Sequence, residues 1–270
     1  MNYRSSYFIL TCLGLGFAFL YIPILSMVVF SFNASKLVTV WDTANSPTLK
    51  WYYALLNNEE ILDAAWISLK VAVINASGSV ILGTLAGFGL ARFRQFRGRF
   101  TLNAMTTAPL VMPEVITGLS LLLLLVAVAV DRGFWTVAIA HTTMAMCFVT
   151  VIVQARLIDF DMSLEEAAMD LGASPLRTFL AVTLPLILPA IAAAWMLAFA
   201  LSLDDLVIAS FTTGPGATTL PIRIYSEVRL GVKPEMNAVC SIMVGVVGIA
   251  VIAASLLAKL SGTRGASARV

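Results

Sequence analysis

Long apolar runs with few charged side chains dominate this sequence and restrict its fold more than any other feature. A helix needs about 20 such residues to cross the hydrocarbon core of a bilayer. We expect spans at about residues 7–32, 68–91, 100–130, 133–156, 186–205 and 236–259. The predicted fold is therefore an all-α integral membrane protein with six transmembrane helices, which form a single domain over residues 1–270.

Charged residues are too scarce to cover the surface of a soluble protein of this size. Asp, Glu, Lys and Arg make up 12% of the chain, against about 25% in ordinary soluble domains. The three cysteines lie singly in apolar runs and His141 is the one histidine, so we expect neither disulfides nor a bound metal. The chain also lacks a Gly-rich phosphate loop and any nucleophile motif. We therefore predict a chain that is not an enzyme, has no catalytic residues and binds no cofactor itself.

Basic residues set the expected orientation, because short cytoplasmic loops carry an excess of Lys and Arg. Ten of the 17 such residues fall in the pieces that a cytoplasmic N-terminus would place inside: 1–6, 92–99, 156–177 and 259–270. We predict that both chain ends are cytoplasmic. The arginines of 92–99 could instead bind phospholipid or nucleic acid, and we favour the topological role. The first apolar run is too long for a signal peptide, so we expect an uncleaved anchor.

The loop 157–185, between the fourth and fifth predicted spans, contains two short helices joined at a glycine, and we call it the elbow. Ser163 and Glu166 have the spacing of a capping box at the start of the first helix. Gly172 is suited to end that helix with a positive φ. Ser174 and Pro175 are suited to begin the second as N-cap and first helical residue.

The first elbow helix carries an apolar stripe. Leu164, Ala168 and Leu171 follow one another at helical spacing, and such a stripe is usually covered. One interpretation is an ordinary amphipathic connector. We favour a docking helix for a cytoplasmic partner.

The elbow sequence resembles the EAA motif of bacterial ABC importer permeases. The family pattern is Glu-Ala-Ala, three residues, Gly, nine residues, Ile, one residue and Leu-Pro, and the one departure is Val182 in place of Ile. The resemblance implies the type I importer fold, with the elbow seated in a groove of an ATPase. The matching residues, which we expect to couple to the ATPase, are Glu166, Ala167, Ala168, Gly172, Leu184 and Pro185.

Further segments narrow the resemblance to the permease subunits of polyamine importers, with the putrescine type most similar. These segments are residues 31–41, 108–118, 203–211 and 214–221. Such a subunit would lie in the bacterial inner membrane as a multi-pass chain. The partners it implies are a second permease subunit, two copies of an ATP-using cytoplasmic ATPase, a periplasmic binding protein, the polyamine and the lipid bilayer, with no nucleic acid.

Other functions stay open at this stage. A spermidine permease, or a permease for another small solute, would show the same elbow. A stand-alone secondary transporter is a weaker alternative, because no inverted repeat is visible. An intramembrane enzyme lacks a nucleophile–base pair or metal cluster in the spans.

Glu114 is a candidate for the substrate path, because it is the one acid in an otherwise uncharged stretch. An ionisable group at membrane depth usually faces a cavity or a partner. Pro109 and Pro113 precede it and loosen the helix, freeing carbonyl oxygens that can accept from a dication. The alternative is an ion pair with a basic residue of the partner subunit.

Asp204 and Asp205 are further candidates at the end of the fifth span. Adjacent helical residues point about 100° apart, so we expect one to face the pore while the other caps or pairs. A solvated helix end is the alternative. Trp195 and Tyr225 can supply cation–π faces, although aromatic side chains in spans more often face lipid or core.

Overall fold

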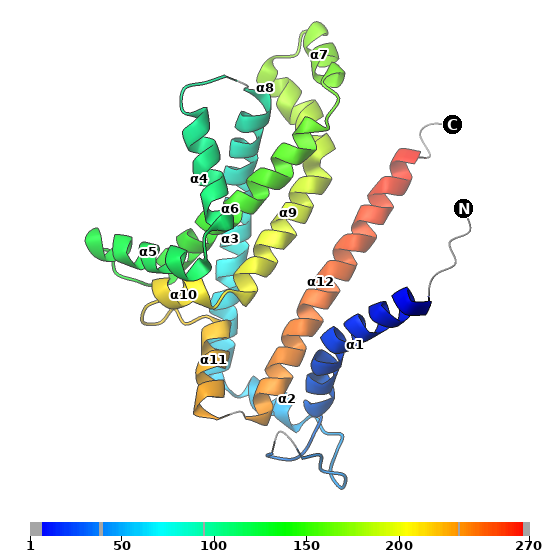
Figure 1. Ribbon diagram of the computed structural model, residues 1–270, viewed down its shortest axis with the longest axis vertical. Coiled ribbons are helices and arrows are strands. Elements are labelled where there is room, and N and C mark those ends of the chain that lie inside the picture. The colour runs from blue at the N-terminus through cyan, green and yellow to red at the C-terminus, as the bar shows by residue number, and fades with distance from the viewer. Residues whose placement is uncertain (1–6, 38–39, 94, 232, 267–270) are drawn as a thin grey trace. The chain divides into compact units, whose positions relative to one another are not determined.

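The computed structural model describes residues 7–37, 40–93, 95–231 and 233–266, with side chains as far as Ile249 together with Ile252. Regular structure in these residues is helical (Figure 1). The elements are α1 (Tyr7–Phe30), α2 (Lys50–Leu56), α3 (Glu59–Arg92), α4 (Arg99–Val111), α5 (Glu114–Ala127), α6 (Phe134–Ile158), α7 (Ser163–Asp170), α8 (Pro175–Thr178), the π-helix η1 (Phe179–Thr183), α9 (Leu184–Asp204), α10 (Val207–Thr212), α11 (Leu220–Leu230) and α12 (Pro234–Ala266).

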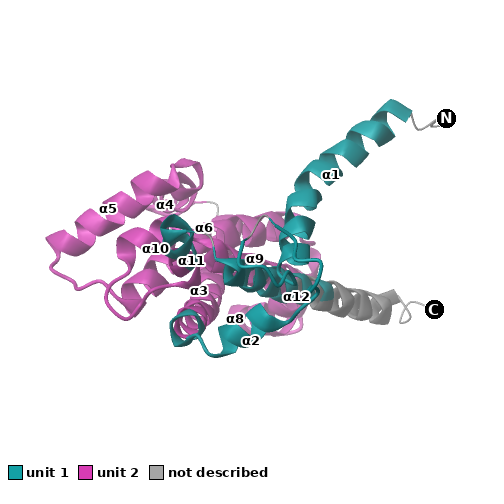
Figure 2. Cartoon of the chain, turned by 90° about the horizontal axis from the view of Figure 1, so that it is seen from below, with its two compact units in different colours: residues 1–62, 224–255 teal, residues 63–223, 256–270 magenta. Residues whose placement is uncertain are grey.

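The chain divides into two compact units, coloured separately in Figure 2. The first contains residues 1–62 and 224–255, and the second contains residues 63–223 and 256–270. Helices α3, α11 and α12 run from one unit into the other. The elbow and the predicted substrate-path acids all belong to the second unit.

Within the described residues, four helical segments are long and apolar enough to cross a membrane. They are α1, α3, α6 and the run from Pro175 to Asp204, and they correspond to the first, second, fourth and fifth predicted spans. Helix α3 begins at Glu59, well before the predicted position. An amphipathic segment, with Glu59 and Glu60 in its first turn, extends the helix on the N-terminal side of the apolar run. Acidic residues in a first turn also favour a helix N-terminus.

The third predicted span, 100–130, forms two helices, and the break lies where Pro109 and Pro113 were expected to loosen it. Helices α4 and α5 meet at an angle of 119°. Met112 between them is extended, with φ −80° and ψ 140°. The cause is Pro113, whose ring disfavours helical geometry in the preceding residue. The bend places Glu114 in the first turn of a new helix, where its carboxylate faces the positive end of the helix dipole.

The sixth predicted span, 236–259, falls within α12. The described part of that helix is apolar over Pro234–Ile249, which is shorter than a full span. Apart from Ile252, the side chains of residues 250–259 lie outside the described residues.

The core of the second unit forms where α6 packs on α3 and α9. Two glycines of α3 make the approach to α6 close. A Cβ on Gly83 would lie 2.6 Å from Val149 Cβ, and one on Gly87 would lie 2.9 Å from the Thr150 carbonyl oxygen. Small residues four apart let membrane helices pack tightly. The main buried side chains are Ala76, Ala145, Val149, Val153, Leu157, Ile187, Ile191, Ala194 and Ala198.

In the first unit, a buried asparagine organises the loop between α1 and α2. The Asn33 side chain donates to the Val40 carbonyl at 2.7 Å and accepts from the Asp42 amide at 3.0 Å. The indole of Trp51, itself buried, donates to the Asn33 carbonyl at 2.6 Å. Helix α1 itself buries none of its side chains in the described structure, so its apolar surface is open to lipid or another subunit.

Candidate functional site

The turn of the elbow has the backbone geometry predicted for it. Gly172 has φ +88°, and its amide donates to the Met169 carbonyl at 2.8 Å. The Ala173 amide donates to the Ala168 carbonyl at 3.1 Å, which completes a Schellman motif. Ser174 then caps α8, accepting from the Arg177 amide at 3.4 Å. These bonds fix the angle between the two elbow helices.

The predicted capping box at the start of α7 was wrong. Helix α7 begins at Ser163 itself, and no side chain of its N-cap residue, Met162, caps it. Asp161 supplies the acceptor instead, with its Oδ1 3.0 Å from the Ser163 amide nitrogen. Asp side chains form such turns readily with the amide two residues on. The Ser163 amide and hydroxyl hold the pKa of the Asp161 carboxyl below its ordinary value.

The matched motif on α7 lies at the surface. Glu166 and Ala167 are exposed and Ala168 is half-buried. Leu164 and Leu171 are exposed as well, at 46% and 90%, so the predicted apolar stripe has no cover in the described chain. The Glu166 side chain is exposed and forms no part of a cap in the described chain.

The Leu184-Pro185 end of the motif follows the π-helical turn η1. Pro185 has no N–H to donate to Ala181, and its ring would crowd that carbonyl in a regular helix. The widened turn relieves this conflict, and the Leu184 amide bonds the Phe179 carbonyl five residues back. Pro185 is exposed, whereas Leu184 packs against the α6–α9 core.

Glu165, the neighbour of the motif glutamate, was not predicted as a site residue. Its side chain is buried, and Oε1 lies 2.7 Å from Arg92 Nη2 at the end of α3. The Thr183 hydroxyl donates to the same oxygen at 2.7 Å. Arg92 also donates to the Leu157 carbonyl at 3.1 Å. Two adjacent glutamates on a helix point about 100° apart, so the pair Glu165-Glu166 already indicated that the two side chains face different surroundings.

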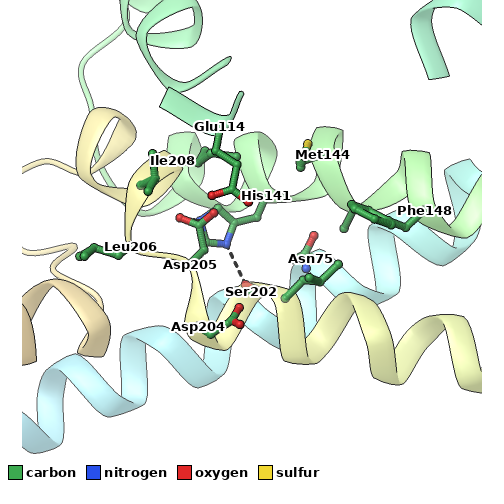
Figure 3. Close-up of a pocket in the computed structure, with 13 residues that line it drawn as sticks. Asn75, Glu114, His141, Met144, Phe148, Ser202, Asp204, Asp205, Leu206 and Ile208 are labelled. Carbon is green, nitrogen blue, oxygen red and sulfur yellow. Dashed lines mark hydrogen bonds and ion pairs between the residues drawn. The ribbon is translucent and has the colours of Figure 1, made fainter. Parts of the chain in front are cut away.

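Three predicted path acids meet at one pocket of about 220 Å³ (Figure 3). Glu114 comes from the first turn of α5, Asp204 from the end of α9, and Asp205 from the junction of α9 and α10. The pocket is lined by Asn75, Glu114, His141, Met144, Ala145, Phe148, Leu201, Ser202, Asp204, Asp205, Leu206, Val207 and Ile208.

One of the two adjacent acids caps a helix as expected, but both line the pocket, because α9 ends between them. Asp204 is its last residue, and Asp205 is extended with φ −66° and ψ 117°. The 100° rule for adjacent helical residues does not apply across such an end. Asp205 also caps α10, accepting from the Ala209 amide at 2.9 Å.

A buried polar group beside the acids was also missed. His141 is 4% exposed, and its Nδ1 lies 2.8 Å from Ser202 Oγ. Asn75 is buried in α3 and donates to the Ala198 carbonyl at 2.8 Å. The sequence did indicate this residue, because a lone histidine inside an apolar run is a polar group at membrane depth, and such groups usually line a cavity.

Neither aromatic candidate is among the residues that line this pocket. Trp195 stacks on Phe199 with ring centroids 5.3 Å apart and donates to Ser77 Oγ at 3.3 Å, outside the pocket lining. Tyr225 belongs to the first unit, where the Arg229 guanidinium lies 4.5 Å from its ring centroid. That guanidinium occupies one face of the ring.

A family model for the binding-protein-dependent transport system inner membrane component matches residues 79–263. The chain belongs to this family. This family of inner-membrane components includes permeases that resemble the chain over nearly its whole length. The putrescine transport system permease protein PotI of Escherichia coli K12 is 53% identical over 241 residues, covering 87% of this chain and 85% of the relative. The spermidine/putrescine permease PotC of the same organism is 41% identical over 243 residues, covering 90% of each.

Solved structures of other transporters share the fold of this family member. A chain of a bacterial ABC transporter that imports alginate has a TM-score of 0.72 at 17% identity, covering 96% of this chain and 98% of that one. A chain of the inward-facing methionine ABC transporter MetNI has a TM-score of 0.64 at 20% identity, covering 74% of this chain and 95% of that one. The fold is therefore that of an ABC importer permease.

Proposed function

We propose that this chain is a translocation subunit of an ATP-driven importer for polyamines, with putrescine as the first candidate substrate. The observation that carries the proposal is the convergence of Glu114, Asp204 and Asp205 on one pocket. Carboxylates in a partly apolar pocket suit a small organic dication, because its charges need acceptors and its methylenes need apolar walls. The 53% identity to a putrescine permease supports the choice of cation.

The exposed motif on the elbow supports coupling to a separate ATPase. Glu166, Ala167 and the apolar stripe present one polar and several apolar contacts to a cytoplasmic partner. Gly172 sets the angle at which α7 meets α8. Leu184 and Pro185 connect that elbow to the fifth span. Closure of the ATPase would thus move α9 through the elbow.

The complete transporter in this proposal has several parts. This chain supplies six spans, with α4 and α5 as one bent span and both ends in the cytoplasm. It pairs with a second permease subunit, and two ATPase copies drive the pair. A periplasmic binding protein delivers the polyamine. ATP is used by the ATPase, so this chain remains a non-catalytic subunit and binds no cofactor itself.

Spermidine is the second candidate substrate, favoured by the 41% identity to a spermidine/putrescine permease. Both cations would meet the same carboxylates. Uptake of labelled putrescine and spermidine by the same complex, each loaded on its binding protein, separates the two. Faster uptake of putrescine supports the first candidate, and faster uptake of spermidine replaces it with the second.

The proposal is tested by purifying the tagged chain from detergent-solubilised membranes. We expect an ATPase to copurify, and its hydrolysis to rise when polyamine-loaded binding protein is added. The unloaded binding protein is the control. A folded chain that transports polyamine with no ATPase would point to a stand-alone transporter. A complex stimulated by a different solute would replace the substrate.

A further inference from the structure

We propose that Arg92, Glu165 and Thr183, together called the clamp, are positioning residues that pass movement of the elbow to α3 and α9 at once. This inference rests on the proposed coupling of the elbow to an ATPase. The clamp joins three elements through one carboxylate oxygen, Glu165 Oε1. Arg92 Nη2 at the end of α3 and Thr183 Oγ1 in η1 each lie 2.7 Å from it.

The clamp spans the weakest point of the elbow's connection to the membrane. Between α8 and α9, the π-helical turn Phe179–Thr183 and Pro185 interrupt the regular hydrogen-bond ladder. Kinks and bends concentrate at such positions. Without a second connection, displacement of α7 would be absorbed there as bending. Because Glu165 on α7 holds Thr183, the last residue of η1, α7 and the start of α9 move together.

Arg92 extends the connection to helices α3 and α6. Its second guanidinium nitrogen donates to the Leu157 carbonyl at 3.1 Å, near the end of α6. The guanidinium also lies 5.3 Å from the Phe160 ring centroid. The Arg92 and Glu165 side chains are each 11% exposed, so the ion pair is shielded from water and from salt. Such bonds are strong and directional, as a force-transmitting contact requires.

Thr183→Val tests the clamp with the least disturbance, because it removes the hydroxyl and keeps the branched shape. Thr150→Val is the matched control. Thr150 is equally buried, at 1% exposure, and within the described residues its hydroxyl bonds the Met146 carbonyl of its own helix, at 2.7 Å, and no other element. Each variant is assembled with its natural partner subunits in proteoliposomes, and the ATP hydrolysed per polyamine imported is measured.

We expect both complexes to retain ATPase at wild-type yield. We expect the ATP cost per imported polyamine to rise about threefold or more in Thr183→Val, since a hydrogen bond to a charged group is lost, and to stay at the wild-type value in Thr150→Val. Glu165→Gln keeps an acceptor for Thr183, so its ATP cost per imported polyamine should fall between the costs of Thr183→Val and wild type. The cost in Glu165→Ala should be higher than in Glu165→Gln and in Thr183→Val.

Equal ATP cost in Thr183→Val and Thr150→Val would overturn the clamp as a coupling device, while leaving the proposed function intact. A purely structural role would lower the yield or the melting temperature of the complex and leave the cost per transported molecule unchanged. A wild-type complex without ATPase or polyamine uptake would instead refute the proposed function, and the clamp inference with it.

Discussion

Asp205 Oδ1 lies 3.7 Å from His141 Nε2, and the other ring nitrogen of His141 bonds Ser202. Asp205 also accepts from the Ala209 amide. Both contacts fall on the same oxygen, Oδ1, and of the two only the Ala209 amide lies within hydrogen-bond distance. Within the described part of the chain, Glu114 and Asp204 form no ion pair, although they line the same pocket. We infer that Glu114 and Asp204 are the carboxylates available to a cation, and that Asp205 maintains the shape of the pocket.

Neutralising Glu114 or Asp204 should weaken polyamine uptake without loss of assembly. We expect Glu114→Gln and Asp204→Asn each to raise KM about tenfold, since a lost charged hydrogen bond costs about 1.5 kcal/mol. Asp131→Asn removes an exposed acid outside the pocket and is the control. The measurement is the concentration dependence of labelled uptake. Wild-type KM in an assembled Glu114→Gln complex would remove Glu114 from the path.

Asp205→Asn should behave differently, because an asparagine can still cap α10. We expect little change in the yield of the complex, since Asn and Asp cap helices about equally well. Asp205→Ala removes the cap and should lower stability by about 1 kcal/mol. Thermal unfolding of the purified complex measures both variants. Equal melting temperatures for the two would contradict the capping role of Asp205.

Four of the six predicted spans appear as long apolar helices in the described residues, because crossing a bilayer demands such helices and hydropathy reports that demand directly. The bend between α4 and α5 was visible as Pro113, but a proline alone does not say whether a helix kinks slightly or turns by 119°. That angle depends on what α5 packs against. It packs on α10, a short helix that lies far away in sequence.

The acids illustrate the same limit at the level of single side chains. The pocket depends on α9 ending at Asp204, and no glycine or proline marks that end in the sequence. Likewise, Glu165 and Glu166 are chemically identical neighbours. The inward glutamate is the one that meets Arg92, which lies 73 residues earlier in the chain. Local patterns predicted the helices and the Gly172 turn, whereas long-range packing decided which carboxylates act together.

Gly172→Ala should strain the elbow, because a φ of +88° is unfavourable for any residue with a Cβ. The expected loss is about 1 kcal/mol in stability, together with reduced transport per ATP. Gly98→Ala is the matched control, since Gly98 has φ +92°, equally open surroundings and a position outside the elbow. Proteoliposome uptake and ATP hydrolysis are compared. Equal coupling in the two variants would show that the angle at Gly172 is not required.

Glu166→Lys should reduce the amount of ATPase that copurifies, because Glu166 is exposed and makes no cap within the elbow. Its effect on the chain itself should be small, about 0.5 kcal/mol from a reversed charge in the first turn of α7. Asp170→Lys is the control, since it places the same charge at the other end of that helix. Unchanged ATPase yield and transport in Glu166→Lys would remove the residue from the docking surface.

Gly83→Ala should destabilise the chain, although alanine normally favours a helix over glycine. The new Cβ would lie 2.6 Å from Val149 Cβ and 2.8 Å from the Met146 carbonyl, so α3 and α6 would have to separate. Overpacking of this kind costs about 1–3 kcal/mol. Gly89→Ala, on the same helix with nothing within 4 Å, should instead stabilise by about 0.5–1 kcal/mol. The melting temperature should therefore fall in Gly83→Ala and rise in Gly89→Ala. A higher melting temperature in Gly83→Ala would show that α3 and α6 do not pack this closely.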